Sequence, residues 1–413
     1  MNKRRVVVTG MGVKSSIGNN LQTFFNNLKN GVHGIRPIEF FDCSRISVKL
    51  ASYNYDFTPS DYFSGRELKR ADRFCQFAIA AAADALDGQN LLDFYNDPFR
   101  IGVVFSSGIG GFATWQAQHE NFLKKGPAGV SAFFIPMMIS NMAAGMVSIA
   151  TGFCGDNFGT ASACASSNHA IGEAFHKIRD GYIDACVAGG TEAGMNEFVF
   201  AGFQNMMALT RATDQDAASI PFDRRRSGFV MGEGSAALVL EELECAKKRG
   251  AEIYCEIVGY GATCDAFNIT KPKPGGVAQS QCMKKALADG EVDLAEVDYV
   301  NAHGTSTKIN DETETEALRS LFKGHADNLL VSSTKSMTGH MLGAAGAVEA
   351  VATALSLKNG IVFPTVGLVE RDEKCDLNYV AGSAVEKNIK TAISNSFGFG
   401  GHNACICFKK FEG

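Results

Sequence analysis

ASSNHAIGEAFHKIRDG at residues 165–181 and MLGAAGAVEAVATALSLKNG at residues 341–360 share one construction. Each follows a side chain that can react, Cys164 or His340, is rich in Ala, Gly and Ser, and closes on a polar stop ending in Gly. The final glycine of each is predicted to end a helix in the left-handed conformation. Small side chains let helices approach closely, so we predict that both helices are buried at the centre of the molecule. Unless the likeness is a coincidence between two Ala-rich helices, such halves would bring Cys164 and His340 together.

The rest of the chain alternates short β-branched runs with longer helical patterns. The helical pattern FCQFAIAAAADAL, residues 74–86, follows the first of these runs. Alternation of this kind is typical of α/β proteins, with parallel strands and helices on both faces of the sheet. The strand-like runs are RVVVTG at 5–10, IGVVFSSG at 101–108, ACVAGG at 185–190, AALVLEEL at 236–243, YVNAHG at 299–304 and LLVSST at 329–334.

Composition excludes several classes of protein. With 413 residues, 46% of them hydrophobic and 20% charged, the chain can bury a substantial core. A net charge of −5 gives no general attraction for nucleic acid or an anionic membrane. The opening MNKRRVVVTG does not resemble a signal peptide, and no apolar run reaches the roughly 18 residues that span a bilayer. We therefore expect a cytoplasmic protein with no nucleic-acid or membrane partner.

The twelve cysteines include no CxxC pair, and disulfides are not expected in the cytoplasm. Apart from Cys164, we interpret them as small buried apolar residues. Cys405 and Cys407 alternate with their neighbours as strand residues do.

The first strand-like run leads into Gly10-Met11-Gly12, which we expect to form a turn. A dinucleotide-binding turn needs a third glycine where Ser15 stands, and the chain has no GxxxxGK[ST] loop. Nucleotide binding is therefore not predicted.

Three residues carry the chemistry. Cys164, in GTASACASSNHAIG, stands at a predicted helix N-terminus, where unpaired N–H groups and the helix dipole favour the nucleophilic thiolate. Taken alone, a cysteine in an Ala-rich stretch is more often a core residue. His303 in YVNAHGTST and His340 in SSTKSMTGHML each stand where a predicted strand ends, the position at which α/β folds build their sites.

The segment NSFGFGGHN, residues 395–403, is a glycine-rich turn around Phe397 and Phe399. Gly398 and Gly400 permit unusual dihedral angles and close backbone approach. Such a turn can offer N–H groups to an oxyanion and can move, although a plain tight turn has the same composition.

In their order and spacing, SACASS, NAHGTST, SSTKSMTGHMLGAAGAVEA and NSFGFGGHN resemble the elongating β-ketoacyl-acyl-carrier-protein synthases, and most of all the synthase II type. The resemblance covers essentially the whole chain and includes GIGGF, FFIPMMISNMAAG, AGGTEAG and PFDRRRSGFVMGEG. It implies a thiolase-like α/β fold in which two fused, pseudo-duplicated halves form five layers, α-β-α-β-α. We place the halves at residues 1–250, with the nucleophile, and 251–413, with both histidines and the glycine-rich turn.

The resemblance also implies a mechanism. An acyl group is carried on Cys164, and His303 and His340 promote decarboxylation of malonyl-carrier protein so that the enolate attacks the acyl group. The oxyanion is held by N–H groups of Cys164 and Phe399, whose turn acts as a gate. The supporting residues are Lys335, Glu349, Asp311 and Glu314; Thr305 and Thr307 bind the phosphopantetheine arm; and Ile109, Phe203 and the partner's Phe134 line the acyl pocket.

The same resemblance implies an acyl carrier protein as partner, a homodimer, and no cofactor or catalytic metal, since the substrates arrive on phosphopantetheine. Two features depart from the pattern: Lys308 replaces a usual Pro, and the loop QNMMALT after Phe203 is one residue short. A lysine at position 308 resembles the pattern in ketosynthases of type II polyketide pathways. The alternative is therefore a polyketide or aryl polyene ketosynthase, which would work as a heterodimer with a related chain. A degradative thiolase is disfavoured because it needs a second cysteine near NSFGFGGHN.

Overall fold

The strands of the computed structural model, which describes residues 3–413, form two half-sheets with the same internal order. The first runs β5-β4-β6-β7-β1 and the second β10-β9-β13-β14-β8, and a short antiparallel pairing of β1 with β8 joins them. The strands are β1 (Val6–Lys14), β4 (Ile101–Ser106), β5 (Asn157–Phe158), β6 (Ala185–Glu192), β7 (Gly234–Glu242), β8 (Cys255–Cys264), β9 (Tyr299–Asn301), β10 (Leu330–Ser332), β13 (Thr391–Gly398) and β14 (His402–Lys409).

The direction of the strands is only partly as predicted. In each half the outer three strands are parallel, but β1, β7, β8 and β14 pair antiparallel with their neighbours. The expectation of parallel strands is therefore wrong for these four. The reason is clearest for β14, which follows β13 across the three-residue turn Phe399–Gly401, too short for the crossover that a parallel strand needs.

The expected turn at Gly10-Met11-Gly12 is also wrong, because strand β1 continues through it to Lys14. A Cβ atom on Gly10 would lie 2.2 Å from the carbonyl oxygen of Ala85, and one on Gly12 would lie 2.0 Å from that of Ala81. The glycines thus allow helix α3 (Arg73–Leu86) to lie directly on the strand.

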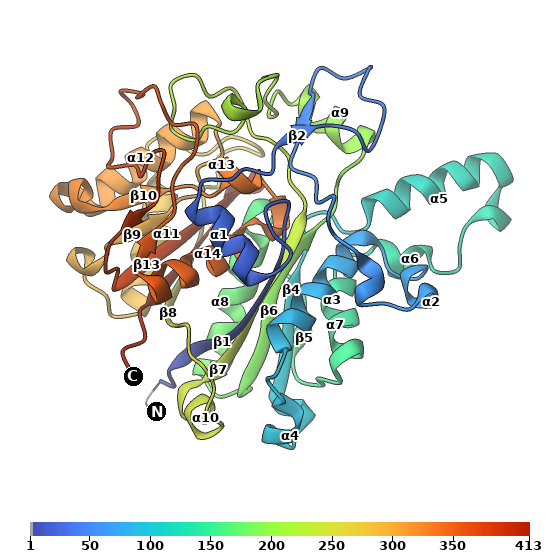
Figure 1. The fold of residues 1–413 in the computed structure, drawn as a ribbon, viewed down its shortest axis with the longest axis horizontal. Coiled ribbons are helices and arrows are strands. Elements are labelled where there is room, and N and C mark those ends of the chain that lie inside the picture. The colour runs from blue at the N-terminus through green and yellow to red at the C-terminus, as the bar shows by residue number, and fades with distance from the viewer. Residues whose placement is uncertain (1–2) are drawn as a thin grey trace.

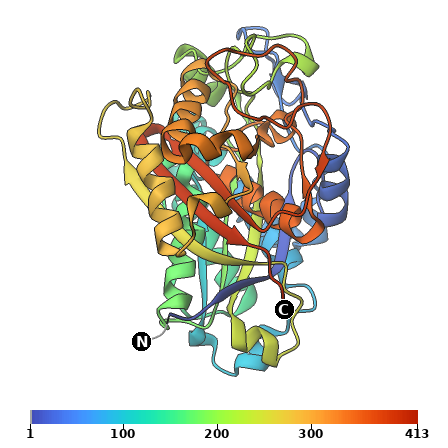
Figure 2. The ribbon, with the colours of Figure 1, turned by 90° about the vertical axis from the view of Figure 1, so that its left-hand side faces the viewer.

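Helices and half-sheets alternate in five layers, as the resemblance implied (Figure 1). Helices α8 (Ser166–Arg179) and α14 (Ala345–Asn359) form the central layer and contact both half-sheets. Helices α3 and α7 (Met142–Thr151) cover the outer face of the first half-sheet, and α11 (Val277–Asp289) with α12 (Lys308–Phe322) covers that of the second. Figure 2 views this arrangement from the side of the C-terminal half.

The buried side chains on the two faces of the second half-sheet belong to two separate hydrophobic cores. On β14, Ala404, Ile406 and Phe408 point into the core around the central helices, whereas Cys405 and Cys407 point into the core beneath α11. The prediction that cysteines are buried apolar residues is confirmed for these two and for Cys75, Cys186, Cys255, Cys282 and Cys375. It is wrong for Cys154 and Cys264, which are exposed, and Cys43 and Cys245 are half-buried; all twelve are free thiols.

The remaining elements lie around this framework. Helices α5 and α6 extend from the N-terminal half as an arm (Figure 1). No helix within residues 3–413 is long and apolar enough to cross a membrane. The remaining helices are α1 (Leu21–Lys29), α2 (Gly65–Leu68), α4 (Leu91–Tyr95), α5 (Phe112–Lys125), α6 (Phe134–Met138), α9 (Glu197–Asn205), α10 (Leu243–Lys248) and α13 (Lys335–Thr338), and the small sheets pair β2 (Arg36–Pro37) with β3 (Leu50–Ala51) and β11 (Ile361–Val362) with β12 (Val385–Glu386).

The two central helices are buried and close, as predicted from their small residues. A Cβ atom on Gly346 of α14 would lie 2.7 Å from Oδ1 of Asn168 on α8 and 2.9 Å from Oγ of Ser396 on β13. At the other end of these helices, Gly181 and Gly360 have positive φ values of 84° and 64°, which confirms the predicted helix ends.

We predict that Gly346→Ala lowers the free energy of unfolding by about 1–3 kcal/mol, because the added methyl group overpacks the contact between the central helices. Chemical denaturation measures the change. Gly202→Ala on α9 is the matched control, since a Cβ atom there meets nothing within 4 Å. Equal stability of the two variants would contradict this account of the central layer.

Candidate active site

Cys164 lies in a tight turn, Ala163–Ala165, that leads directly into α8. Ala163 has a positive φ of 51°, and Ser166 holds the turn by accepting from the N–H of Ser162 and donating to the carbonyl of Ala163. The Cys164 side chain is 7% exposed, so the sulfur is buried but borders open space. This is the predicted position of a nucleophile at the start of a helix.

His340 is brought to the sulfur from the other half of the chain. Its backbone joins the segment before β7: the N–H donates to Val230, and the carbonyl accepts from Gly232. Its Nε2 atom lies 3.1 Å from Sγ of Cys164. The predicted meeting of Cys164 and His340 is thus present in the structure.

His303 lies just beyond the end of β9 and is held by its main chain. Glu314 of α12 accepts hydrogen bonds from the N–H groups of His303 and Gly304, at 2.9 and 2.8 Å. The imidazole rings of His303 and His340 are 5.3 Å apart, nearly perpendicular. Both histidines therefore face the same space beside Cys164.

Lys335 and Glu349 form a buried ion pair behind the histidines, with 1% and 2% of their side chains exposed. Nζ of Lys335 also lies 3.3 Å from Nδ1 of His303. Because an ammonium group can only donate, Nδ1 of His303 is the acceptor, and the proton of the neutral ring sits on Nε2. Lys335 thereby selects the tautomer of His303 in which Nε2 is the hydrogen-bond donor.

The ionisation of the site follows from burial and from Lys335. Burial, with the Lys335 charge and His340 adding to it, holds the pKa of His303 well below its usual value. Burial and Lys335 do the same to the pKa of His340. The two imidazoles are therefore neutral and can each donate one N–H.

Opposing effects act on the thiol. Burial raises the pKa of Cys164 to about 12, and the Glu192 charge raises it too. The Lys335 charge and hydrogen bonding from the backbone amides of Phe399 and Cys164 lower it. These are the two amides that the resemblance implies as oxyanion donors.

The glycine-rich turn closes over Cys164. Gly398 packs on the nucleophile turn so tightly that a Cβ atom there would lie 2.6 Å from the carbonyl oxygen of Ser162 and 3.1 Å from the amide nitrogen of Cys164. Gly400 and Gly401 have positive φ values of 83° and 78°. The close packing leaves no room for a side chain at Gly398, so the turn contacts the nucleophile turn as well as connecting two strands.

Cys164, His303 and His340 line one cavity of about 690 Å³. Thr305 and Thr307, whose hydroxyl oxygens are 2.9 Å apart, lie on its wall. Of the three predicted acyl-pocket residues, only Phe203 lines this cavity, where its ring lies 6.5 Å from that of Phe399. Ile109 packs beside Gly194 outside it, and Phe134 lies on the arm.

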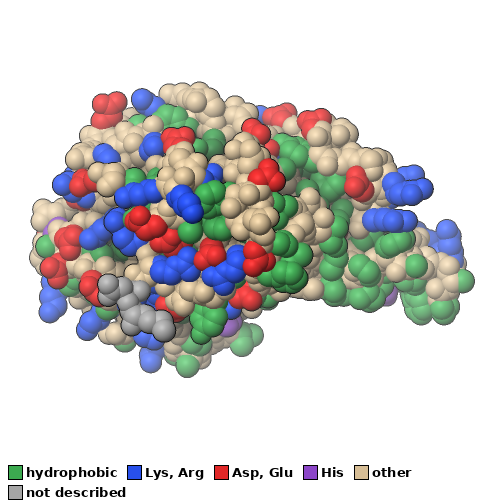
Figure 3. Space-filling view, turned by 90° about the horizontal axis from the view of Figure 1, so that it is seen from below, with side chains coloured by type: hydrophobic (Ala, Val, Ile, Leu, Met, Phe, Trp, Pro, Cys, Tyr) green, Lys and Arg blue, Asp and Glu red, His purple; other side chains and the backbone are tan. Residues whose placement is uncertain are grey.

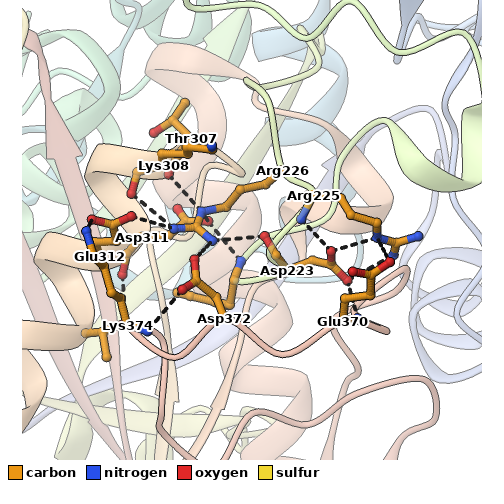
Figure 4. A network of polar contacts seen from close by, with 12 residues as sticks. Asp223, Arg225, Arg226, Thr307, Lys308, Asp311, Glu312, Glu370, Asp372 and Lys374 are labelled. Atoms are coloured by element: carbon orange, nitrogen blue, oxygen red, sulfur yellow. Dashed lines mark hydrogen bonds and ion pairs between the residues drawn. The ribbon is translucent and has the colours of Figure 1, made fainter.

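Asp311 is placed differently from the other supporting residues. It accepts from the N–H of Phe222 and lies 3.4 Å from Nε of Arg226, a fully buried arginine. Arg226 also donates to the carbonyl groups of Thr307 and Lys308 and pairs with Asp372 (Figure 4). Asp311 therefore supports the threonine segment, whereas Glu314, Lys335 and Glu349 support the histidines.

Several residues at the site were not singled out from the sequence. Phe229 places its ring 5.1 Å from that of His340, and Asn395 donates to Glu314 at 3.2 Å. Glu192, at the end of β6, is fully buried next to the nucleophile turn. The signal for Glu192 was present, because a carboxylate that ends the run ACVAGGTE must find donors when the strand is buried.

Comparison with known proteins identifies the class. The family models described as beta-ketoacyl synthase, N-terminal domain, and beta-ketoacyl synthase, C-terminal domain, match residues 3–246 and 254–369. The chain therefore belongs to the β-ketoacyl synthase family and is a condensing acyltransferase, which confirms the resemblance seen in the sequence.

The relatives are similar over their full length. A 3-oxoacyl-[acyl-carrier-protein] synthase 2 of Synechocystis sp. is 46% identical over 413 residues, covering 100% of this chain and 99% of that protein. One of Staphylococcus aureus is 47% identical over 409 residues, with 99% of both chains covered. A solved structure of a type II PKS acyl-carrier protein in complex with its ketosynthase bound to the hexaketide has a TM-score of 0.90 and 32% identity, covering 99% of this chain and 100% of that one.

We predict that Lys335→Met raises the pKa values of His303 and His340, because the ammonium group that lowers them is removed. The thiol pKa of Cys164 also rises, so its alkylation by iodoacetamide at neutral pH becomes slower. Alkylation rates measured against pH, with NMR titration of the histidines, check both effects. Lys14→Met removes another buried lysine, paired with Asp84, and serves as the control. An unchanged alkylation profile in Lys335→Met would refute the role of this charge.

Proposed function

We propose that this β-ketoacyl synthase elongates acyl chains by two carbons, with Cys164, His303 and His340 as its catalytic residues. The observation that carries the proposal is the 3.1 Å contact between Sγ of Cys164 and Nε2 of His340, with the neutral His303 ring beside it. One nucleophile and two neutral N–H donors facing one cavity suit a decarboxylative condensation.

In the first step the thiolate of Cys164 attacks the thioester carbonyl of an acyl-carrier protein. The bond between the carbonyl carbon and the carrier sulfur breaks, and the carrier leaves as a thiol with the proton that Cys164 lost. The amides of Cys164 and Phe399 hold the negative oxygen of the tetrahedral intermediate.

In the second step malonyl-carrier protein takes the place of the first carrier protein. The N–H groups of His303 and His340 then donate hydrogen bonds to the oxygen of its thioester carbonyl. The bond to the carboxylate breaks, carbon dioxide leaves, and the electron pair forms an enolate that the two donors stabilise. The enolate carbon attacks the acyl carbonyl, the bond to Cys164 breaks, and the sulfur leaves as a thiolate that takes up a proton from solvent. These steps balance without a redox cofactor or a metal ion.

The cavity wall supports an acyl carrier protein as partner. Thr305 and Thr307 offer adjacent hydroxyl groups to the amides of a pantetheine arm. Arg224, Lys271 and Lys308 line the cavity with exposed basic side chains, which suit the phosphate of that arm and an acidic carrier. A ketosynthase of similar structure is known in complex with such a carrier protein.

The acyl chains are best explained as those of fatty-acid synthesis. The relatives at 46–47% identity are 3-oxoacyl-[acyl-carrier-protein] synthases of type 2, whereas the ketosynthase bound to a hexaketide is 32% identical. A polyketide ketosynthase is the second candidate because Lys308, which resembles that group, is an exposed residue that lines the cavity. A cytoplasmic location suits either pathway, since Cys164 must stay reduced.

Variants of the three residues test the mechanism by separating its half-reactions. Cys164→Ala should lose transfer of a radiolabelled acyl group from carrier protein as well as condensation. His303→Ala and His340→Ala should retain more of the acyl transfer but lose about 3 kcal/mol or more of transition-state stabilisation in condensation, by analogy with an oxyanion donor.

Cys282→Ala, which changes a buried cysteine under the second half-sheet, is the control for loss of a thiol. Acyl transfer by Cys164→Ala would overturn the assignment of the nucleophile. Normal malonyl decarboxylation in both histidine variants would overturn theirs.

We propose that the protein is a homodimer because apolar side chains are exposed on the arm and on α7. Figure 3 shows hydrophobic side chains gathered along the arm and where it joins the body. On the arm and α7, Leu123, Ile135 and Ile149 are 69%, 54% and 79% exposed. A patch of this kind on a free monomer is unusual and marks an interface. The expected occupant is a second copy, whose Phe134 would then complete the acyl pocket.

We predict that Ile135→Asp and Ile149→Asp shift the protein from dimer to monomer, because a charge would be buried in an apolar interface. Sedimentation velocity measures the shift, and Val369→Asp, at a position 78% exposed on the opposite half of the chain, is the control. A monomeric wild-type protein with full activity would exclude the homodimer, and co-purification with a related chain would favour the polyketide candidate.

A further inference from the structure

Glu192 is a buried carboxylate that the mechanism above does not use. It ends β6, is 0% exposed, and receives only neutral donors. In contrast, the buried Glu233 and Glu241 each pair with an arginine. The donors to Glu192 are the hydroxyl of Ser107 at 2.8 Å and the N–H groups of Gly108 at 2.8 Å, Ile109 at 3.3 Å and Gly343 at 3.0 Å.

These donors belong to two turns from different halves of the chain that both bind this carboxylate. One turn, residues 107–109, follows β4 and carries Ile109. The other, residues 340–343, follows helix α13 in the opposite half and carries His340, and its Leu342 lines the active-site cavity. Leu342 has a positive φ of 46°, a strained conformation that must be held by its surroundings.

The two turns are in direct backbone contact around Glu192. A Cβ atom on Gly343 would lie 2.3 Å from the amide nitrogen of Gly108 and 2.7 Å from Oε2 of Glu192. One on Gly108 would lie 2.7 Å from the same Oε2 and 3.6 Å from the carbonyl oxygen of Ala163. The carboxylate therefore lies where the Ile109 turn, the His340 turn and the Cys164 turn converge.

Resting on the proposed function, we propose that Glu192 is a positioning residue: its carboxylate fixes the Ile109 turn against the His340 turn and so sets which acyl chains Cys164 accepts. Ile109 packs its side chain beside Gly194, where a Cβ atom would lie 2.7 Å from Cδ1 of Ile109. The Glu192 carboxylate holds the N–H of Ile109, whose side chain lies outside the cavity that Cys164 lines. The resemblance places Ile109 at the acyl pocket, and in this held position it would close one side of that pocket. Released, it can turn aside and admit longer chains.

The charge of Glu192 provides a second, independent measurement. Among the groups that act on the thiol, Glu192 raises the pKa of Cys164, and Lys335 and the backbone amides of Phe399 and Cys164 lower it. Removing the Glu192 charge should therefore move the alkylation profile of Cys164 to lower pH. A substitution that keeps the charge but shortens the side chain should leave that profile in place.

Glu192→Gln and Glu192→Asp separate the two effects. In Gln an amide donor replaces an acceptor and faces N–H groups, and in Asp the carboxylate is one methylene too short to hold both turns. For both variants we expect the ratio of kcat/KM for long-chain over short-chain acyl-carrier proteins to rise about tenfold. Only Glu192→Gln should also shift the alkylation of Cys164 by iodoacetamide to lower pH.

Glu241→Gln is the control, since it removes a carboxylate of equal burial from the adjacent strand β7. It should lower stability and leave both the length ratio and the alkylation profile as in the wild type. The inference is overturned if active Glu192→Gln or Glu192→Asp has the wild-type length ratio. If Glu192→Gln does not fold, Glu192→Asp decides. Absence of condensation by the wild-type protein would instead defeat the proposed function.

Discussion

The close contact between α8 and α14 is the constraint on which the site depends. The two helices belong to different halves, and each begins beside a residue that reacts. They meet where Gly346 faces Asn168, and the N–H of Ala347 donates to the hydroxyl of Ser167 at 2.9 Å. One helix thus supplies a hydrogen-bond acceptor for the unpaired N-terminal amide of the other. Because neither helix can be displaced without losing this bond, Cys164 and His340 are fixed relative to one another.

A second constraint is the balance of charge around the thiol. Glu192, Glu314 and Glu349 are fully buried, and burial raises the pKa of each carboxyl to about 7. Lys335 is the basic group among them, paired with Glu349 and adjacent to His303. Burial and then this one cation lower the pKa values of both imidazoles, and the same cation favours the thiolate against burial and Glu192. Burying an ammonium group is costly unless it is paired, so Glu349 makes that position possible.

Much of this arrangement could be predicted from the sequence, and the failures have physical causes. The small residues of the central helices and the ends at Gly181 and Gly360 were sufficient to predict buried, adjacent helices. The direction of the strands could not be predicted, since a strand has the same side-chain pattern whichever way it runs. Glu192 was missed because three of its four donors are backbone N–H groups, which every residue except proline has. Exposure of Cys154 and Cys264 depends on where loops and strand ends lie, which composition does not determine.

The turn at Phe399 has a consequence for how the protein is made. The amide that acts on the Cys164 thiol comes from a segment that the ribosome synthesises long after Cys164 itself, and β1 must wait for β7 before it can pair. Such distant pairings are slow and leave the nascent chain incomplete for much of translation. During that time the sulfur lacks both His340 and Phe399. The emerging polypeptide therefore carries Cys164 without the groups that surround it in the folded protein, and the site is complete only when the second half has docked on the first.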